Sequence, residues 1–184
     1  RSNRALWMIL SGCSVAISGQ TYLVADKVTP KGAQVKEFAT GALRYMLLTS
    51  SSPGNDMNLD PRRLEGARNF GNKIWNAARF VVSNLEHARA DVVLAARSLE
   101  DRWIVSRLNR VVGEATELFE SHQYGEAGRR INDFLWSEFC DWYIEACKIR
   151  LYGQDIAARA TAQATLVRVL DQALRLLHPY MPFV

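Results

Sequence analysis

The stretch RNFGNKIWNAARF, residues 68–80, carries the helical pattern that decides how this chain folds. It lies in a longer segment that begins with Asp60, a good N-cap residue, and Pro61, which suits the first helical position. At about 100° of rotation per residue, a helix running to about residue 85 gathers its apolar residues into one band, centred about 150° from Arg62. This band, predicted to face the core, contains Leu64, Ala67, Gly71, Ile74, Ala78, Val81, Val82 and Leu85.

The other side of the same helix combines polar side chains with one aromatic ring. Arg62, Asn69, Lys73, Asn76 and Phe80 all fall within about 40° of the Arg62 direction. The pattern therefore predicts that Phe80 faces away from the core. A ring among cations and amides suits stacking on an unpaired base, which contributes about 1–3 kcal/mol per base. The alternative is that Phe80 packs under a neighbouring helix or loop.

The same periodicity predicts further helices in four other places. These are residues 35–49, 98–121, 125–151 and 157–177, with a loop at SSSPGND, residues 50–56. Segments of this kind with short connections predict a mainly α fold, an antiparallel bundle of four to five helices.

The N-terminal segment has a different pattern. The two short apolar runs in VAISGQTYLV, residues 15–24, flank Gly19-Gln20, which is typical of a type II′ β-hairpin. We therefore divide the chain into an unassigned N-terminal segment, residues 1–36, and a helical domain, residues 37–184. Because the chain begins without Met and ends at MPFV, we expect it to be a fragment of a longer protein.

Composition indicates a folded globular protein, with 48% hydrophobic and 23% charged residues in a chain of 184. The net charge of +4 permits an anionic partner without requiring one. No apolar run approaches the roughly 18 residues of a membrane span. The cysteines are odd in number and fit a reducing, cytoplasmic compartment, and Cys140 and Cys147 are predicted to be buried on one helix face.

Candidate catalytic groups are few. Glu138, Asp141 and Glu145 crowd one helix face, and paired carboxylates can serve general acid–base chemistry. Basic neighbours such as Lys148 favour a structural role as ion-paired charges instead. The histidines lack metal-ligand spacing, and neither a phosphate-binding loop nor a nucleophile motif is present. The sequence predicts no catalytic residue, no metal site and no cofactor for this chain.

Four segments together carry a family resemblance. They are ALRYMLLTSSSPGNDMNLDPRRLEGARNFGNKIWNAARFV (42–81), DRWIVSRLNRVV (101–112), YGEAGRRINDFLWSEFCDWYIEACK (124–148) and LLHPYMPF (176–183). In this order they resemble the anticodon-binding domain of class I aminoacyl-tRNA synthetases, and WSEFCDWYIE is most similar to the valyl-tRNA synthetases. The resemblance covers roughly residues 37–184. The isoleucyl and leucyl enzymes share the domain type.

The resemblance implies a helical bundle that receives the anticodon loop of tRNA(Val). By motif, it places tRNA contacts at Arg62, Phe80 and Ile144, to which the polar face adds Asn69, Lys73 and Asn76; burial in the core is the alternative for Ile144. Arg62 and Phe80 are separated by about 27 Å along a straight helix and cannot hold one base together.

The resemblance also has departures. The family's HIGH and KMSKS motifs for ATP are missing, and FATGALR, residues 38–44, has Gly41 where the family usually has an acidic residue. The parent protein is then expected to be a monomeric, ATP-dependent valine–tRNA ligase whose catalytic domain lies on the same polypeptide, and this chain alone is expected to be inactive. The alternatives are the same domain of an isoleucyl enzyme and a synthetase-derived protein-interaction module.

Overall fold

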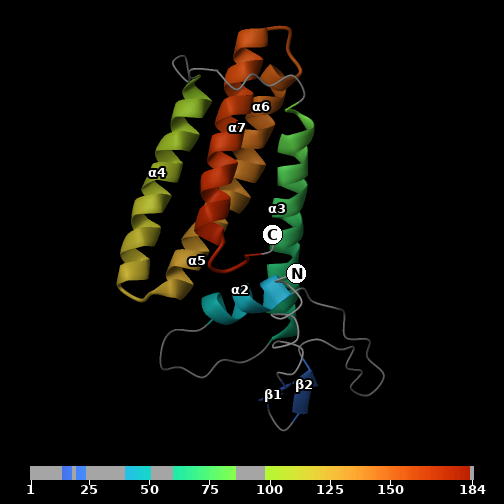
Figure 1. The fold of residues 1–184 in the computed structure, drawn as a ribbon, viewed down its shortest axis with the longest axis vertical. Coiled ribbons are helices and arrows are strands. Elements are labelled where there is room, and N and C mark those ends of the chain that lie inside the picture. Colours follow the sequence, from blue (N-terminus) through green and yellow to red (C-terminus); the bar gives the residue numbers. More distant parts are fainter. Residues whose placement is uncertain (1–13, 18–19, 24–39, 51–59, 86–97, 183–184) are drawn as a thin grey trace, which may run out of the picture.

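The chain folds into a bundle of helices, seen in the computed structural model in Figure 1. The structure describes residues 14–17, 20–23, 40–50, 60–85 and 98–182. Its helices are α2 (Thr40–Ser50), α3 (Pro61–Ser83), α4 (Leu99–Glu120), α5 (Tyr124–Asp133), η1 (Phe134–Tyr143), α6 (Ile144–Leu151) and α7 (Ile156–Leu177). The predicted mainly α bundle is confirmed, and from α3 onward the helix bounds agree with the predicted ones to within two residues. Residues 35–39 of the first predicted helix lie outside the described residues.

The long helix predicted at 125–151 is a single rod whose middle part is wound differently. α5, η1 and α6 follow one another without a break, and η1 is a π-helix. At its end the amide of Ile144 donates to the carbonyl of Phe139, five residues earlier. We call α5, η1 and α6 together the central rod. The π-helix is rare, and its usual form, a single-turn bulge within an α-helix, is frequent at functional sites.

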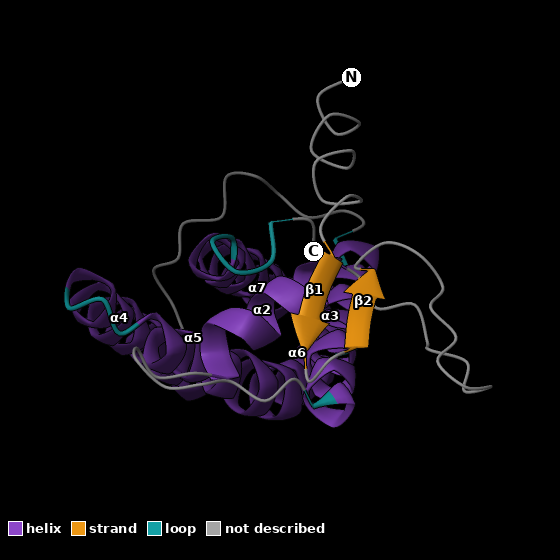
Figure 2. Cartoon of the chain, turned by 90° about the horizontal axis from the view of Figure 1, so that it is seen from below, coloured by secondary structure: helices purple, strands orange, loops and turns teal. Residues whose placement is uncertain are grey.

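The direction of each helix follows from its partners along the central rod. α4 and α7 run antiparallel to the rod, whereas α3 runs parallel to it (Figure 1). Lys73 of α3 contacts Asp141, 68 residues later, and Phe80 contacts Lys148 with the same offset. α3 and the rod therefore lie side by side in register over much of their length. Seen from below, α2 crosses the lower end of the bundle (Figure 2).

Aromatic packing joins α2 to the rest of the core. The ring of Tyr45 lies 5.3 Å from that of Phe70 on α3 and 6.1 Å from that of Tyr180, which follows α7. A Cβ atom on Gly128 would lie 2.6 Å from Thr49 Cγ2, so α2 approaches α5 as closely as it does because residue 128 has no side chain. The largest fully buried side chains are Tyr143, Tyr180, Phe70, Phe134, Phe139, Met46, Ile74, Ile104, Leu108, Ile131, Leu135 and Leu166.

A buried ion pair fixes the start of α4 against the central rod. Ser98 caps α4, and the carboxylate of Asp101, which is 0% exposed, accepts two hydrogen bonds of 2.7 Å from Arg150 and one of 2.6 Å from Tyr143. Burial alone would raise the pKa of Asp101, but the hydrogen bonds from Arg150 and Tyr143 hold that pKa below its ordinary value. The carboxylate is therefore charged and fully partnered inside the protein.

The N-terminal segment contains a two-stranded hairpin, as predicted. β1 (Ser14–Ile17) pairs antiparallel with β2 (Gln20–Leu23), and Ile17 is opposite Gln20. Gln20 is thus the first residue of the second strand, whereas the sequence pattern assigns it to the turn. Register explains the difference, because pairing of Ile17 with Gln20 leaves only residues 18 and 19 to connect the strands.

Candidate nucleic-acid interface

The buried face of α3 is rotated from its predicted position by about 50°. Its buried residues are Ala67, Phe70, Ile74, Ala77 and Val81, which centre about 100° from the Arg62 direction. Val82, which the pattern assigns to the core, is 65% exposed, so that prediction is wrong. The physical reason is the central rod, which packs beside α3 and covers Phe70 with the ring of Trp136.

Phe80 consequently lies at the edge of the core and not opposite it. The ring is half-buried and packs against the core cluster, which corrects the prediction that it faces away. The ammonium of Lys148, on α6, lies 5.7 Å from the centre of the Phe80 ring, within the range of a cation–π contact. Part of the ring remains accessible from solvent beside a positive charge.

Lys73, two turns earlier on α3, has a similar environment. Its ammonium lies 2.6 Å from a carboxylate oxygen of Asp141 and 3.9 Å from the centre of the Trp136 ring, both on η1. Trp136 in turn stacks on Phe70, with ring centres 6.4 Å apart. Lys73 is therefore held in place by an ion pair and an aromatic face.

We call this line of contacts between α3 and the central rod the α3–rod seam. It consists of Lys73, Phe80, Trp136, Asp141 and Lys148. Each of its two lysines covers an aromatic ring, so cations and rings alternate along it. The seam joins two of the predicted site residues to three residues of a second helix.

The other predicted site residues separate into two groups. Arg62, Asn69 and Asn76 are exposed on α3, where their donors are available to a ligand. Ile144 is only 6% exposed and belongs to the hydrophobic core, in agreement with the alternative that sequence analysis leaves open for it. Its side chain has little surface to offer to a ligand.

The acidic residues of the central rod are paired, as predicted. Arg107 of α4 donates to both carboxylate oxygens of Glu138, at 2.7 and 2.6 Å. Lys148 lies 2.6 Å from Glu145, so the cation above Phe80 is also part of an ion pair. These carboxylates serve as structural charges that orient the lysines of the seam and the neighbouring arginine.

The two cysteine thiols of the rod are protonated near neutral pH. Cys147 is buried and Cys140 is half-buried, and burial raises the pKa of each thiol to about 11. Among the described residues, no cluster of His, Cys, Asp and Glu could hold a metal ion. None of the helices described is long and apolar enough to cross a membrane.

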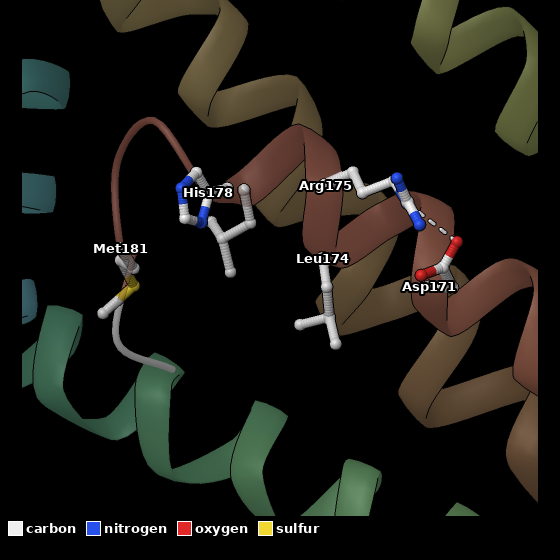
Figure 3. A pocket seen from close by; sticks show the side chains of 6 residues that line it. Asp171, Leu174, Arg175, His178 and Met181 are labelled. Carbon is white, nitrogen blue, oxygen red and sulfur yellow. Dashed lines mark hydrogen bonds and ion pairs between the residues drawn. The ribbon is translucent and has the colours of Figure 1, made fainter.

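An open hollow at the end of α7 lies apart from the seam. It measures about 260 Å³ and is bordered by Leu174, His178 and Met181 on one side and by the pair of Asp171 and Arg175 on the other (Figure 3). Arg175 donates to Asp171 at 2.9 Å, so the two charges at the rim are directed at each other. Each lysine of the seam lies over an aromatic ring, whereas the cation at this hollow is directed at a carboxylate.

Trp136 and Lys148 are the seam residues that sequence analysis misses. Both lie in the segment 124–148 that carries the resemblance, and both are of the residue types that suit RNA, an aromatic ring and a cation. The helical pattern of α3 alone does not reveal them, because their relevance depends on which helix packs beside α3. The parallel offset of 68 residues is a property of the tertiary structure.

Comparison with known proteins agrees with these features. Residues 101–184 match the family model of the anticodon-binding domain of tRNA ligase. A valine–tRNA ligase of Dehalococcoides mccartyi is 51% identical over 150 residues, which are 82% of this chain, and one of Symbiobacterium thermophilum is 51% identical over 152 residues. The valine–tRNA ligase of Bacillus subtilis is 43% identical over 152 residues. This chain spans 17% of the length of each of these relatives.

The helical bundle and these matches define the class of the protein: the chain belongs to the anticodon-binding domains of tRNA ligases. Within that class, the relatives named above are valine–tRNA ligases, to which this chain is 43–51% identical. The isoleucyl alternative and the alternative of a protein-interaction module are less well supported than this assignment.

Proposed function

We propose that the α3–rod seam binds the unpaired anticodon loop of tRNA(Val). The observation that carries the proposal is the pairing of each seam lysine with an aromatic ring, Lys73 with Trp136 and Lys148 with Phe80. Single-stranded RNA is recognised by the same combination, in which bases stack on rings and cations meet the phosphates.

The proposed RNA contacts are of three kinds: base stacking, phosphate binding and hydrogen bonding to base edges. Phe80 offers the half-exposed ring on which a base stacks, and Lys148 is positioned to meet the adjoining phosphate. Asn69 and Asn76 lie exposed along the same side of α3, and their amides can donate to and accept from base edges. Lys73 contributes a phosphate contact once RNA competes with Asp141 for its ammonium.

In the whole ligase this domain would hold the anticodon while the acceptor end of the tRNA reaches the catalytic domain on the same polypeptide. ATP-dependent activation of valine would take place in that catalytic domain, and the domain described here would contribute affinity and selection of the tRNA. We further propose that the ligase acts as a monomer in the cytoplasm.

Binding of RNA by the purified chain tests the proposal. Fluorescence anisotropy would compare a tRNA(Val) transcript, the same transcript with a changed anticodon and an unrelated tRNA of equal length. We expect the first to bind most tightly and the changed anticodon to weaken binding. Equal affinity for all three RNAs would contradict recognition of the anticodon, and capture of a protein without RNA binding would favour an interaction module.

A further inference from the structure

A second hollow lies at the lower end of the bundle, between α2, α3 and α5. It measures about 250 Å³. The residues that line it are Tyr45, Met46, Thr49, Ser50, Arg63, Gly66, Ala67 and Asn132. Nothing in the sequence comparison or in the predicted set of tRNA contacts assigns a role to this hollow.

The hollow lies below the α3–rod seam, between α3 and the start of the central rod. Two residues of its lining are Arg63 on α3 and Asn132 on α5. Asn132 follows Arg63 by about the same number of residues as the 68 by which Asp141 follows Lys73. Because α3 and the central rod run parallel, residues with this offset lie side by side at the same height. The hollow therefore lies between the same two helices as the seam, below Lys73 and Phe80.

The lining of the hollow has the chemistry of a base-binding pocket. The guanidinium of Arg63 is exposed at its rim, and the amide of Asn132 can donate and accept at a base edge. Met46 and Ala67 supply buried apolar walls. Sites for drug-sized ligands measure about 300–1,000 Å³, so the smaller hollow suits a single nucleobase.

A second cation lies at the α2 side of this hollow. Arg129 of α5 donates to the carbonyl of Thr49 at 3.2 Å and remains half exposed, although it also pairs with Glu126 at 3.0 Å. Arg63 lines the hollow, and Arg129 lies beside it because it contacts Thr49, another of the lining residues. Each guanidinium offers several donors to phosphate oxygens.

We propose that this hollow takes one further unpaired nucleotide of the same RNA, with its base inside and its phosphate near Arg63 and Arg129. The inference rests on the proposed function and adds a second contact point to it. Arg63 and Phe80 are separated by about 26 Å along α3, which corresponds to roughly seven or eight stacked nucleotides at about 3.4 Å each. A single stem-loop can therefore reach both points.

Gly66 provides a direct test because it lines the hollow and has no atom within 4 Å of the position of a Cβ. Gly66→Leu would place a side chain beside the hollow, its Cβ would meet no neighbouring atom, and the substitution would favour the helix. We expect the affinity for a tRNA(Val) transcript to fall about 5-fold or more, by analogy with the loss of a bound base. Gly113→Leu is the matched control, since Gly113 is also an exposed helical glycine with open space around it, on α4.

Arg63→Gln is the second variant, because Arg63 is exposed and its replacement leaves the core untouched. Melting temperatures of all the variants would be measured beside the affinities. Weaker binding by Gly66→Leu and Arg63→Gln, with Gly113→Leu unchanged, supports the pocket.

Wild-type affinity in both variants overturns the pocket, while loss of affinity in Phe80→Leu would still support the seam. Failure of the unmodified chain to bind the transcript overturns the proposed function and the pocket together.

Discussion

Phe80 is the residue where local pattern and tertiary structure disagree most. The pattern of α3 places it on the polar face, yet the ring is half-buried against the core with Lys148 above it. Phe80→Ala should therefore reduce stability as well as RNA affinity, although by less than the about 3–5 kcal/mol of a fully buried Phe.

Phe80→Leu separates the two contributions. Leucine keeps most of the packing but removes the ring, so the melting temperature should stay near the wild-type value. RNA affinity should fall by about 1–3 kcal/mol, roughly 5- to 150-fold, because the stacked base loses its partner. Anisotropy titrations and thermal melts on the same preparation measure both. Unchanged affinity in a stable Phe80→Leu protein would show that the ring only packs.

The environment of Lys73 predicts a substitution that raises RNA affinity. Its ammonium is neutralised by Asp141 at 2.6 Å, so Asp141→Asn should release a positive charge in the seam. RNA affinity should then rise, and the slope of log K against log salt should steepen by roughly 0.7 if Lys73 gains one phosphate. Asp171→Asn on α7 makes the same charge change in the exposed pair with Arg175 and is the control. An equal rise in both variants would mean that only net charge matters.

At the scale of elements, the pair of Asp101 and Arg150 joins the start of α4 to the central rod. Asp101→Asn leaves Arg150, whose side chain is 17% exposed, without its charged partner. Breaking a buried pair in this way should lower the free energy of unfolding by about 3–5 kcal/mol. Urea unfolding at pH 7 measures the loss. A loss below about 1 kcal/mol would show that the pair behaves like a surface ion pair.

The same pair predicts a dependence of stability on pH. The pKa of folded Asp101 is lowered from an ordinary value of 3.8, so the pair contributes stability above that value and loses it as the pH falls through the folded pKa. The difference in stability between wild type and Asp101→Asn should therefore be constant near neutral pH and shrink only in acid. A difference that shrinks already between pH 7 and pH 5 would contradict this assignment.

The helices themselves are predictable because their signals are local. Asp60 accepts a hydrogen bond from the amide of Arg62 at 2.9 Å, as expected of an N-cap, and the apolar period defines the length of each helix. The rotation of α3 is not local, since it depends on burial of Phe70 beside the central rod. The π-helix of η1 is likewise invisible to a search for a period of 3.6 residues.

The candidate site is likewise predictable only where its signals are local to one helix. Exposure of Arg62, Asn69 and Asn76 could be predicted from one helix, whereas the seam required knowledge of the partner helix. Trp136 and Lys148 acquire their role only because the rod runs parallel to α3 with an offset of 68 residues. Residue types suggest a function, and packing decides which of them act together.

At the scale of the whole molecule, the chain is predicted to bind tRNA without catalysing aminoacylation. Motifs that handle ATP are missing from the sequence, and the raised pKa values of about 11 keep the Cys140 and Cys147 thiols protonated near neutral pH. Valine-dependent pyrophosphate exchange by the purified chain should match a mock preparation. Exchange above that background, abolished by a substitution within this chain, would contradict the prediction.

The last prediction is that the helical bundle folds without residues 1–34. The described core extends from Ala42 to Met181, and α2 is tied to the rest by the hydrogen bond of Tyr45 to Gly128 and by the contact of Tyr45 with Phe70. A domain of about 150 residues buries enough surface to be stable alone. A truncated protein that begins at Val35 should therefore keep its helical far-UV circular dichroism and melt cooperatively within a few degrees of the full chain. Loss of the cooperative transition on truncation would mean that the N-terminal segment completes the core and belongs to the same folding unit.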